Sequence, residues 1–315
     1  MRTLFTGITV AVMTILLAPT AAMGRLFGND EVQRRLPLWC MQTWARSICR
    51  AAGVRIVMHG SENILTERGA VYASNHVSWF DIFAIASVLP RYTFVAKAEL
   101  RRIPIFGWGA EACGVVFMER ENRTSAFDAY RAVAATVSSG LSVVVYPEGT
   151  RGDSYALRSF KKGPFVLAIA AGAPVVPVVA FGTREITPRG TWRVRSGVVH
   201  IHFLPAIETT GYGYEHRHEL MQAAWQQSAD TLRLAYGVPQ NGRSTATGAE
   251  STSGENGGET GQSCPVTGNA TAAWPSAHSA GRPWPPPGSR RLPGSAQCAY
   301  RSRSGGYSCW SGAGG

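Results

Sequence analysis

Several kinds of chemistry are missing from this sequence, and each absence narrows the function. The six cysteines include no CxxC pair and no Cys or His spacing that suits zinc, so we predict no metal site and no cofactor. The GxSxG turn of serine hydrolases is absent as well. A net charge of +11 suits anionic lipids or phosphorylated substrates, and because no RNA- or DNA-binding module is visible, we expect no nucleic-acid partner.

The C-terminal quarter of the chain has almost no residues that could build a core. Residues 238–315 contain a single Leu and no Ile, Phe, Met or Lys, while Gly, Ser, Pro and Thr dominate. Such a segment cannot bury enough apolar surface to offset its conformational entropy. We predict that 238–315 is a disordered, dispensable tail and that residues 25–237 form the folded domain.

A long stretch near the beginning of the chain has no charged side chains. Leu4 to Met23 are 20 residues without a charged side chain, long enough as a helix to cross a bilayer. Arg25, Arg34 and Arg35 follow, which places the next domain on the cytoplasmic side. We predict that residues 1–24 anchor the chain in the cell membrane. A cleaved signal peptide is the alternative, and Pro19 leaves a bent, shallow insertion open.

Residues 31–52 combine aromatic and basic side chains. Trp39 and Trp44 alternate with arginines such as Arg46 and Arg50, a mixture that membrane interfaces favour. We therefore expect an interfacial helix here. An ordinary helix packed on the domain fits the pattern equally well.

Apolar or β-branched runs recur through the middle of the chain, separated by helical patterns. A fold of alternating strands and helices is α/β, with a central, largely parallel or mixed sheet and helices on both faces. In such sheets the loops at the strand ends carry the chemistry. The predicted strands are 54–58, 71–74, 92–96, 114–118, 142–146, 175–181 and 198–203.

A histidine and an aspartate lie where the second of these strands gives way to a helix. His76 falls on the turn, and Asp81 falls in the first helical turn, five residues later. A carboxylate that binds one ring nitrogen fixes the tautomer and leaves the other nitrogen free to take a proton from a hydroxyl. His76 and Asp81 are therefore our candidate general base and its orienting partner.

A polar turn with a glycine and an arginine follows the strand at 142–146. Glu148, Gly149, Thr150 and Arg151 come directly after the strand at 142–146. Gly149 permits close backbone approach, the hydroxyl and the guanidinium suit an anionic group, and Glu148 can order the loop or bind a hydroxyl.

Three more basic residues are candidates for the same anion. Arg120 stands at the end of the strand at 114–118, and Lys161 and Lys162 precede a helical run. Arginine donors match phosphate oxygens, and a helix N-terminus favours them too. Pro177, inside the strand at 175–181, indicates an edge strand or a bulge.

Four of these blocks, in this order, resemble the 1-acylglycerol-3-phosphate (lysophosphatidic acid) acyltransferase family. The resemblance spans roughly residues 50–210, and its one departure is Glu119, where Asp is common. The matching motifs are NHxxxxD at 75–81, GxxFxxR at 114–120, EGTR at 148–151 and a Val/Pro strand at 175–179.

The resemblance implies direct acyl transfer to the hydroxyl of a lysophospholipid. The donor would be a thioester, acyl-CoA or acyl-carrier protein, and the bilayer would supply the acceptor. His76 would be the general base and Asp81 its orienting residue, and Pro177 would help to shape the acyl or donor site. The predicted phosphate-binding residues are Arg120, Glu148, Gly149, Thr150, Arg151, Lys161 and Lys162.

Other functions stay open at this point. The same fold could act on another lysolipid, such as a lyso-ornithine lipid. A non-catalytic, membrane-tethered lipid-binding protein would not need His76 and Asp81 together. A hydrolase that activates water through His76 lacks any supporting nucleophile or metal motif.

Overall fold

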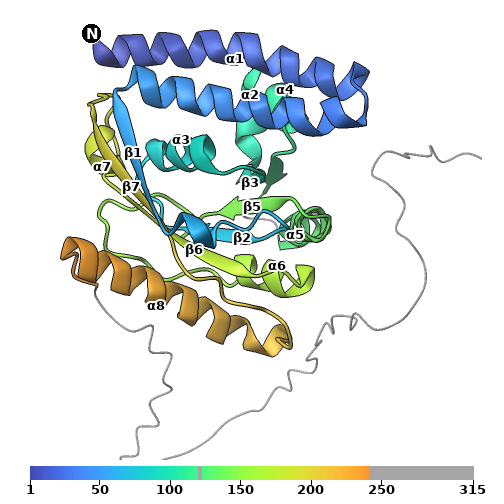
Figure 1. The fold of residues 1–315 in the computed structure, drawn as a ribbon, viewed down its shortest axis with the longest axis vertical. Coiled ribbons are helices and arrows are strands. Elements are labelled where there is room, and N and C mark those ends of the chain that lie inside the picture. Colours follow the sequence, from blue (N-terminus) through green and yellow to red (C-terminus); the bar gives the residue numbers. More distant parts are fainter. Residues whose placement is uncertain (120–122, 241–315) are drawn as a thin grey trace, which may run out of the picture. The chain divides into compact units, whose positions relative to one another are not determined.

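One sheet of seven strands organises the part of the chain that the structure describes. The computed structural model describes residues 1–119 and 123–240, so Arg120 and residues 241–315 lie outside it. Figure 1 shows the sheet between two layers of helices, which confirms the predicted α/β fold. The strands are β1 (Val54–His59), β2 (Val71–Ser74), β3 (Tyr92–Lys97), β4 (Val116–Met118), β5 (Ser142–Val145), β6 (Val175–Phe181) and β7 (Gly197–Phe203).

The sheet is mixed, the second of the two predicted arrangements. Its strand order is β1-β7-β6-β2-β5-β3-β4. From β6 to β4 all neighbours run parallel, whereas β7 runs antiparallel to β6 and β1 runs parallel to β7. The carboxyl ends of β2, β5 and β6 therefore meet at one edge of the sheet, where loops can form a site.

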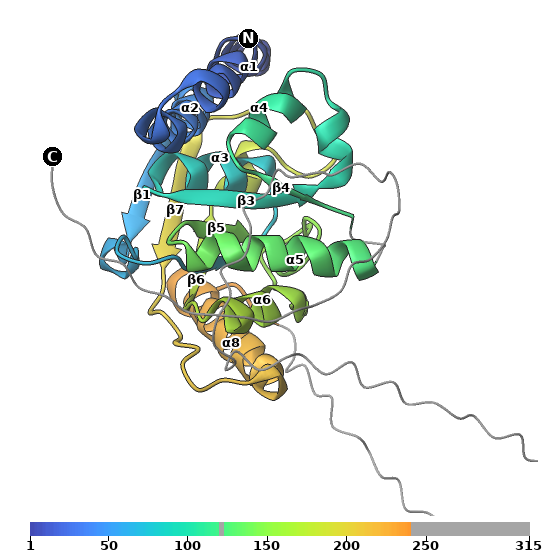
Figure 2. The same cartoon turned by 90° about the vertical axis from the view of Figure 1, so that its right-hand side faces the viewer.

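Helices cover both faces of this sheet. Figure 2 shows α5, α6 and α8 on one side and α2 and α3 on the other, with α1 and α4 farther out. The helices are α1 (Arg2–Phe27), α2 (Asp30–Ala51), α3 (Trp79–Val88), α4 (Phe106–Ala112), α5 (Arg123–Ser138), α6 (Gly163–Ala171), α7 (Thr183–Ile186) and α8 (Arg217–Tyr236), and the 3-10 helices are η1 (Ser61–Asn63), η2 (Ala98–Arg102) and η3 (Tyr214–His216).

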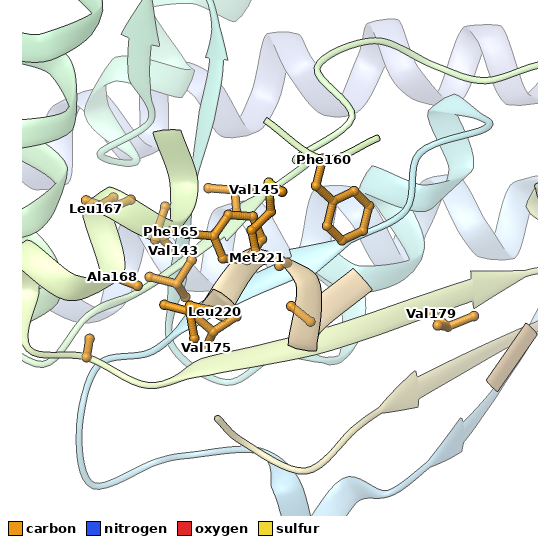
Figure 3. Packing of buried hydrophobic residues seen from close by; sticks show 14 of the residues in the cluster. Val143, Val145, Phe160, Phe165, Leu167, Ala168, Val175, Val179, Leu220 and Met221 are labelled. Atoms are coloured by element: carbon orange, nitrogen blue, oxygen red, sulfur yellow. The ribbon is translucent and has the colours of Figure 1, made fainter. Parts of the chain in front are cut away.

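Alternate side chains of the central strands enter two separate cores. Val143 and Val145 of β5 pack with Phe165 of α6 and Leu220 of α8 (Figure 3), whereas Val144 enters the core on the α3 side. All four residues of β5 are buried. Because both faces are covered, the three valines of this strand form a continuous apolar run rather than an alternating pattern.

The first helix packs on its neighbours and still exposes much of its apolar surface. Trp44 Nε1 of α2 donates a hydrogen bond to Thr14 Oγ1 of α1 at 2.9 Å. On other sides of α1, Leu4 is 66%, Phe5 59% and Leu16 59% exposed. The helix is long and apolar enough to cross a membrane by length and composition. Exposed apolar surface of this kind marks a contact with a membrane or another protein.

Pro177 lies inside the sheet rather than at its edge. Because β6 is hydrogen-bonded to β7 on one side and β2 on the other, the edge-strand prediction is wrong. The alternative, a bulge, agrees with the pairing. Between the pairs Val175–Ile207 and Val178–Phe203, two residues of β6 face three residues of the neighbouring segment. The missing N–H of Pro177 thus falls where the regular ladder is interrupted.

Candidate active site

The turn after β2 is fixed at both ends by side-chain hydrogen bonds. The Asn75 amide donates to the Ala180 carbonyl of β6 at 3.0 Å and accepts from the Ala180 N–H at 2.8 Å. Ser78 is the N-cap residue of α3, and its hydroxyl donates to the Thr187 carbonyl at 3.0 Å. His76 stands between these two anchors, so the backbone that carries its imidazole has a defined place.

A buried carboxylate orients that imidazole. Asp81 lies in the first turn of α3 and is fully buried. Its Oδ2 accepts hydrogen bonds from His76 Nδ1 at 2.8 Å, from Val77 N at 2.7 Å and from Ser78 N at 2.8 Å. An ionised oxygen with these partners holds the ring hydrogen on Nδ1, so Nε2 is the proton acceptor. The His76 side chain is 12% exposed, which leaves part of the ring open to a substrate.

An aromatic ring packs on one face of the imidazole. Tyr146, the residue after β5, stacks on His76 with the ring centroids 4.1 Å apart and the planes 23° apart. Burial raises the pKa of Tyr146 well above its usual range, and the negative charge of Asp81 raises it further. The phenol therefore stays neutral and adds no charge against the imidazole.

The loop that begins with Glu148 binds the backbone of the histidine directly. Glu148 Oε1 accepts from the His76 N–H at 2.9 Å, and the Gly152 N–H donates to the His76 carbonyl at 2.7 Å. Burial raises the pKa of Glu148, opposed by its bonds to the His76 N–H and to Arg158. The motif at 148–151 and the motif at 75–81 are thus parts of one site.

Arg158 closes the same loop, and no motif in the sequence singles it out. Its Nε donates to Glu148 Oε2 at 3.2 Å, and its Nη1 donates to Thr150 Oγ1 at 3.0 Å. Its Nη2 also bonds the Thr150 carbonyl. Arg158 therefore links the buried acid of the loop to the exposed hydroxyl, and it follows them by too many residues for sequence spacing to show this.

Cationic groups gather on the open side of this loop. Gly149 has a φ of +82°, and a Cβ built there would lie 2.7 Å from Lys161 Cε, so the lysine lies against the glycine backbone. The Arg151 guanidinium lies 4.6 Å from the centroid of the Trp79 ring. Burial lowers the pKa of Arg151, and the charge of Arg189 lowers it further. Even so, a guanidinium keeps its charge in proteins.

The remaining predicted residues are placed less closely around His76. Lys162 is exposed and directly precedes α6. Pro177 is buried in β6 in register with Ala73 of β2, so it can shape a substrate site only from behind. Arg120 lies outside the described residues. Within residues 1–119 and 123–240, no group of three or more His, Cys, Asp or Glu side chains could hold a metal ion.

Two further residues near the site are absent from the sequence prediction. Thr183, the first residue of α7, donates from Oγ1 to Asp81 Oδ1. Tyr155 accepts hydrogen bonds from the backbone on either side of Thr183. Tyr155 is 27 and 29 positions from its two backbone partners, and Thr183 is 102 positions from Asp81. No local sequence pattern therefore connects them.

Several known proteins are similar to this chain in sequence. A family model described as Acyltransferase matches residues 55–180, which include the turn at His76 and the loop at Glu148. The chain is 31% identical over 210 residues to the 1-acyl-sn-glycerol-3-phosphate acyltransferase of Limnanthes alba, covering 65% of this chain and 70% of that protein. It is 33% identical over 189 residues to the chloroplastic 1-acyl-sn-glycerol-3-phosphate acyltransferase BAT2 of Brassica napus, covering 60% of this chain and 54% of that one.

The chain covers only part of some relatives in sequence, whereas it covers the whole of one solved structure. The chain spans about half the length of the chloroplastic relatives from Brassica napus and Arabidopsis thaliana. The crystal structure of the 1-acyl-sn-glycerophosphate acyltransferase PlsC from Thermotoga maritima superposes with a TM-score of 0.62 at 25% identity. That match covers 76% of this chain and the whole of the other.

Proposed function

The chain belongs to the 1-acyl-sn-glycerol-3-phosphate acyltransferase family, and from that premise we propose that it acylates the sn-2 hydroxyl of 1-acylglycerol-3-phosphate. The product would be phosphatidic acid, and the donor would be acyl-CoA or acyl-carrier protein. The observation that carries the proposal is the oriented imidazole: His76 Nδ1 is bonded to Asp81 at 2.8 Å, and the ring remains partly exposed.

The chemistry needs one base and no covalent enzyme intermediate. His76 Nε2 takes the proton of the acceptor hydroxyl as its oxygen attacks the carbonyl carbon of the thioester. A C–O bond forms, and the carbonyl electrons move onto oxygen. When the tetrahedral adduct collapses, the C–S bond breaks and the His76 imidazolium returns the proton to the departing thiolate. Asp81 stays ionised throughout and stabilises the imidazolium.

The phosphate of the acceptor would bind at the loop that holds His76. Gly149 brings backbone close to the ligand, and Thr150 and Arg151 offer a hydroxyl and a guanidinium. Arg120, Lys161 and Lys162 would add positive charge. Glu148 and Arg158 order the loop instead of contacting the lipid, because they already bond to His76 N, to Thr150 and to each other.

The membrane would deliver the acceptor to this site. A lysolipid with one acyl chain partitions into the bilayer, and α1 exposes apolar side chains such as Leu4 and Leu16. We propose that α1 holds the protein at the cell membrane with the domain that follows on the cytoplasmic side.

Acyl transfer by the purified full chain in mixed micelles tests the proposal. Acyl-CoA and acyl-carrier protein would each be offered with lysophosphatidic acid, lysophosphatidylcholine or a lyso-ornithine lipid. We expect labelled phosphatidic acid with at least one donor and little product from the other acceptors. Product from the lyso-ornithine lipid alone would contradict lysophosphatidic acid as the acceptor. A folded protein that gives no product with any donor and acceptor would contradict the proposed acyl transfer.

A single replacement then tests the phosphate site. Arg151→Gln should raise KM for lysophosphatidic acid about tenfold or more, because a charge-assisted bond to phosphate is worth at least about 1.5 kcal/mol. Arg233→Gln is the matched control, an exposed arginine on α8 that pairs with Asp230. Equal KM values in the two variants would exclude Arg151 from acceptor binding.

A further inference from the structure

The two oxygens of the Asp81 carboxylate have different partners. Oδ2 serves His76 and the turn backbone, as described above, whereas Oδ1 accepts from the hydroxyl of Thr183. Thr183 is fully buried. It comes from a different part of the chain, the junction between β6 and α7, and among the described residues no hydrogen bond joins it to His76. Its hydroxyl acts on Asp81.

A tyrosine from the loop beyond Arg151 holds Thr183 in place. Tyr155 Oη accepts from Gly182 N at 2.7 Å and from Arg184 N at 3.0 Å, and it donates to Glu185 Oε2 at 2.7 Å. Its ring packs on Phe181, with the centroids 4.4 Å apart. The helix α7 has no side-chain cap of its own. Tyr155 therefore supplies the cap and fixes the backbone on both sides of Thr183.

We propose that Thr183 is a positioning residue that completes the hydrogen bonding of Asp81 and thereby sets the pH at which the His76–Asp81 pair takes up a proton, and that Tyr155 holds Thr183 in position. This inference rests on the proposed role of His76 as the base. It adds the β6–α7 junction, which lies outside the motifs at 75–81 and 148–151, to the residues that position the base.

The direction of the effect follows from the charge on Asp81. A hydroxyl that donates to a carboxylate stabilises its negative charge. Without that bond the carboxylate attracts the proton of the pair more strongly, so the pair becomes protonated at a higher pH. Among the described residues, other titratable or charged groups around the pair are Tyr146, whose ring stacks on the imidazole, and Glu148, which binds the His76 N–H. Arg158 pairs with Glu148, and Arg151 interacts electrostatically with Asp81. Replacing Thr183 removes none of them.

Chemical modification of His76 tests this without acyl transfer. The rate at which diethyl pyrocarbonate modifies the imidazole depends on its neutral fraction, and peptide mass spectrometry follows His76 separately from the other histidines. The full-length protein in detergent would be titrated from pH 5 to 9 as wild type, Thr183→Val and Thr183→Ser. We expect the midpoint to rise by roughly half a unit to one unit in Thr183→Val and to return toward wild type in Thr183→Ser.

Two further variants separate this effect from a general loss of packing. Thr187→Val removes another buried threonine hydroxyl of the same segment, one with no hydrogen-bond partner among the described residues, and should leave the midpoint unchanged. Tyr155→Phe keeps the ring and should shift the midpoint in the same direction as Thr183→Val, by a smaller amount. The acidic limb of the kcat/KM profile should move with the modification midpoint.

The outcomes are distinct from those of the proposed function. A midpoint in Thr183→Val equal to that of the wild type, or equal shifts in Thr183→Val and Thr187→Val, would overturn the inference whether or not the protein is active. A specific shift rescued by Ser would support it even if lysophosphatidic acid is not the acceptor, because modification needs no substrate.

Discussion

At the scale of single residues, Glu148 is an acidic side chain in an almost fully buried position. Its side chain is 2% exposed, and burial is the largest cause of its raised pKa. A folded state that raises the pKa of an acid binds the proton more tightly than the unfolded chain does. The contribution of Glu148 to stability is therefore greatest below about pH 4.3 and is lost as the pH rises through the raised pKa.

Replacing Glu148 by Gln should remove this dependence. The amide oxygen can still accept from the His76 N–H, and no group is left to ionise. We expect the thermal midpoint of Glu148→Gln to fall less than that of the wild type between about pH 4 and pH 7. Glu219→Gln, an exposed position on α8, is the control. Parallel melting curves for wild type and Glu148→Gln across this range would contradict the account.

Which site residues the sequence reveals depends on how far apart they stand. His76 and Asp81 are five positions apart across a strand–helix turn, so local spacing alone brings them together. The bond from Glu148 to the His76 backbone joins two motifs whose strands, β2 and β5, are neighbours in the sheet. Thr183 and Tyr155 could not be predicted, because only the tertiary structure brings α7 beside Asp81 and Tyr155 beside α7.

At the scale of elements, the junction between β6 and α7 depends on one glycine. Gly182 has a φ of +94°, and a Cβ there would lie 2.2 Å from the Val198 carbonyl oxygen of β7. Backbone of a neighbouring strand cannot move aside as a flexible side chain can. A side chain at this position would therefore push α7, and Thr183 with it, away from Asp81.

Paired alanine substitutions can isolate this steric effect. Gly190 also has a positive φ, +79°, but nothing lies within 4 Å of its added Cβ. We expect Gly190→Ala to lower the free energy of unfolding by about 1–2 kcal/mol, from backbone strain alone. Gly182→Ala should cost about 3 kcal/mol or more and should also reduce kcat. Denaturant unfolding measures both, and equal losses would show that the contact with β7 is unimportant.

The strands follow from the sequence more closely than their arrangement does. Each predicted run contains a strand. The signal is clearest for β2, β5 and β6, because strands buried on both faces are mostly apolar and stand out between polar loops. Strand order and direction depend on pairing with distant segments, which local pattern does not encode. Pro177 is the clearest case: the residue indicates an irregular ladder, but only the pairing of β6 with β7 and β2 shows that the strand is internal.

At the scale of the whole molecule, α1 presents apolar surface that needs a partner. We expect simultaneous replacement of Leu4, Ile8 and Ile15 by Ser to weaken binding to lipid vesicles at least about a hundredfold, since each buried apolar side chain contributes about 1.5 kcal/mol or more. All three are more than half exposed. Vesicle flotation measures the effect, and Leu234→Ser, on the exposed side of α8, is the control. Unchanged flotation of the triple variant would rule out α1 as the anchor.

The end of the folded domain can be set more finely than composition allows. The predicted boundary falls at residue 237, but Gln240 Oε1 accepts from Leu157 N at 2.8 Å, and Val238 packs against the core. A chain that ends at Gln240 should keep full acyl transfer, whereas one that ends at Gly237 should lose about 1–2 kcal/mol of stability. Thermal melting of the two truncations tests this. Equal melting temperatures for the two truncations would place the end of the domain at residue 237, as composition predicts.

The central claim is that His76 is the base of an acyl transfer to lysophosphatidic acid. The most direct test is the transfer of radiolabelled acyl groups to this acceptor by membranes that contain the wild type or His76→Ala, with both thioester donors. His59→Ala, which removes another half-buried imidazole on β1, is the control. The account predicts phosphatidic acid from the wild type and the control, and a loss of about 10²-fold to 10⁴-fold in His76→Ala. Phosphatidic acid formed at the wild-type rate by His76→Ala would contradict it.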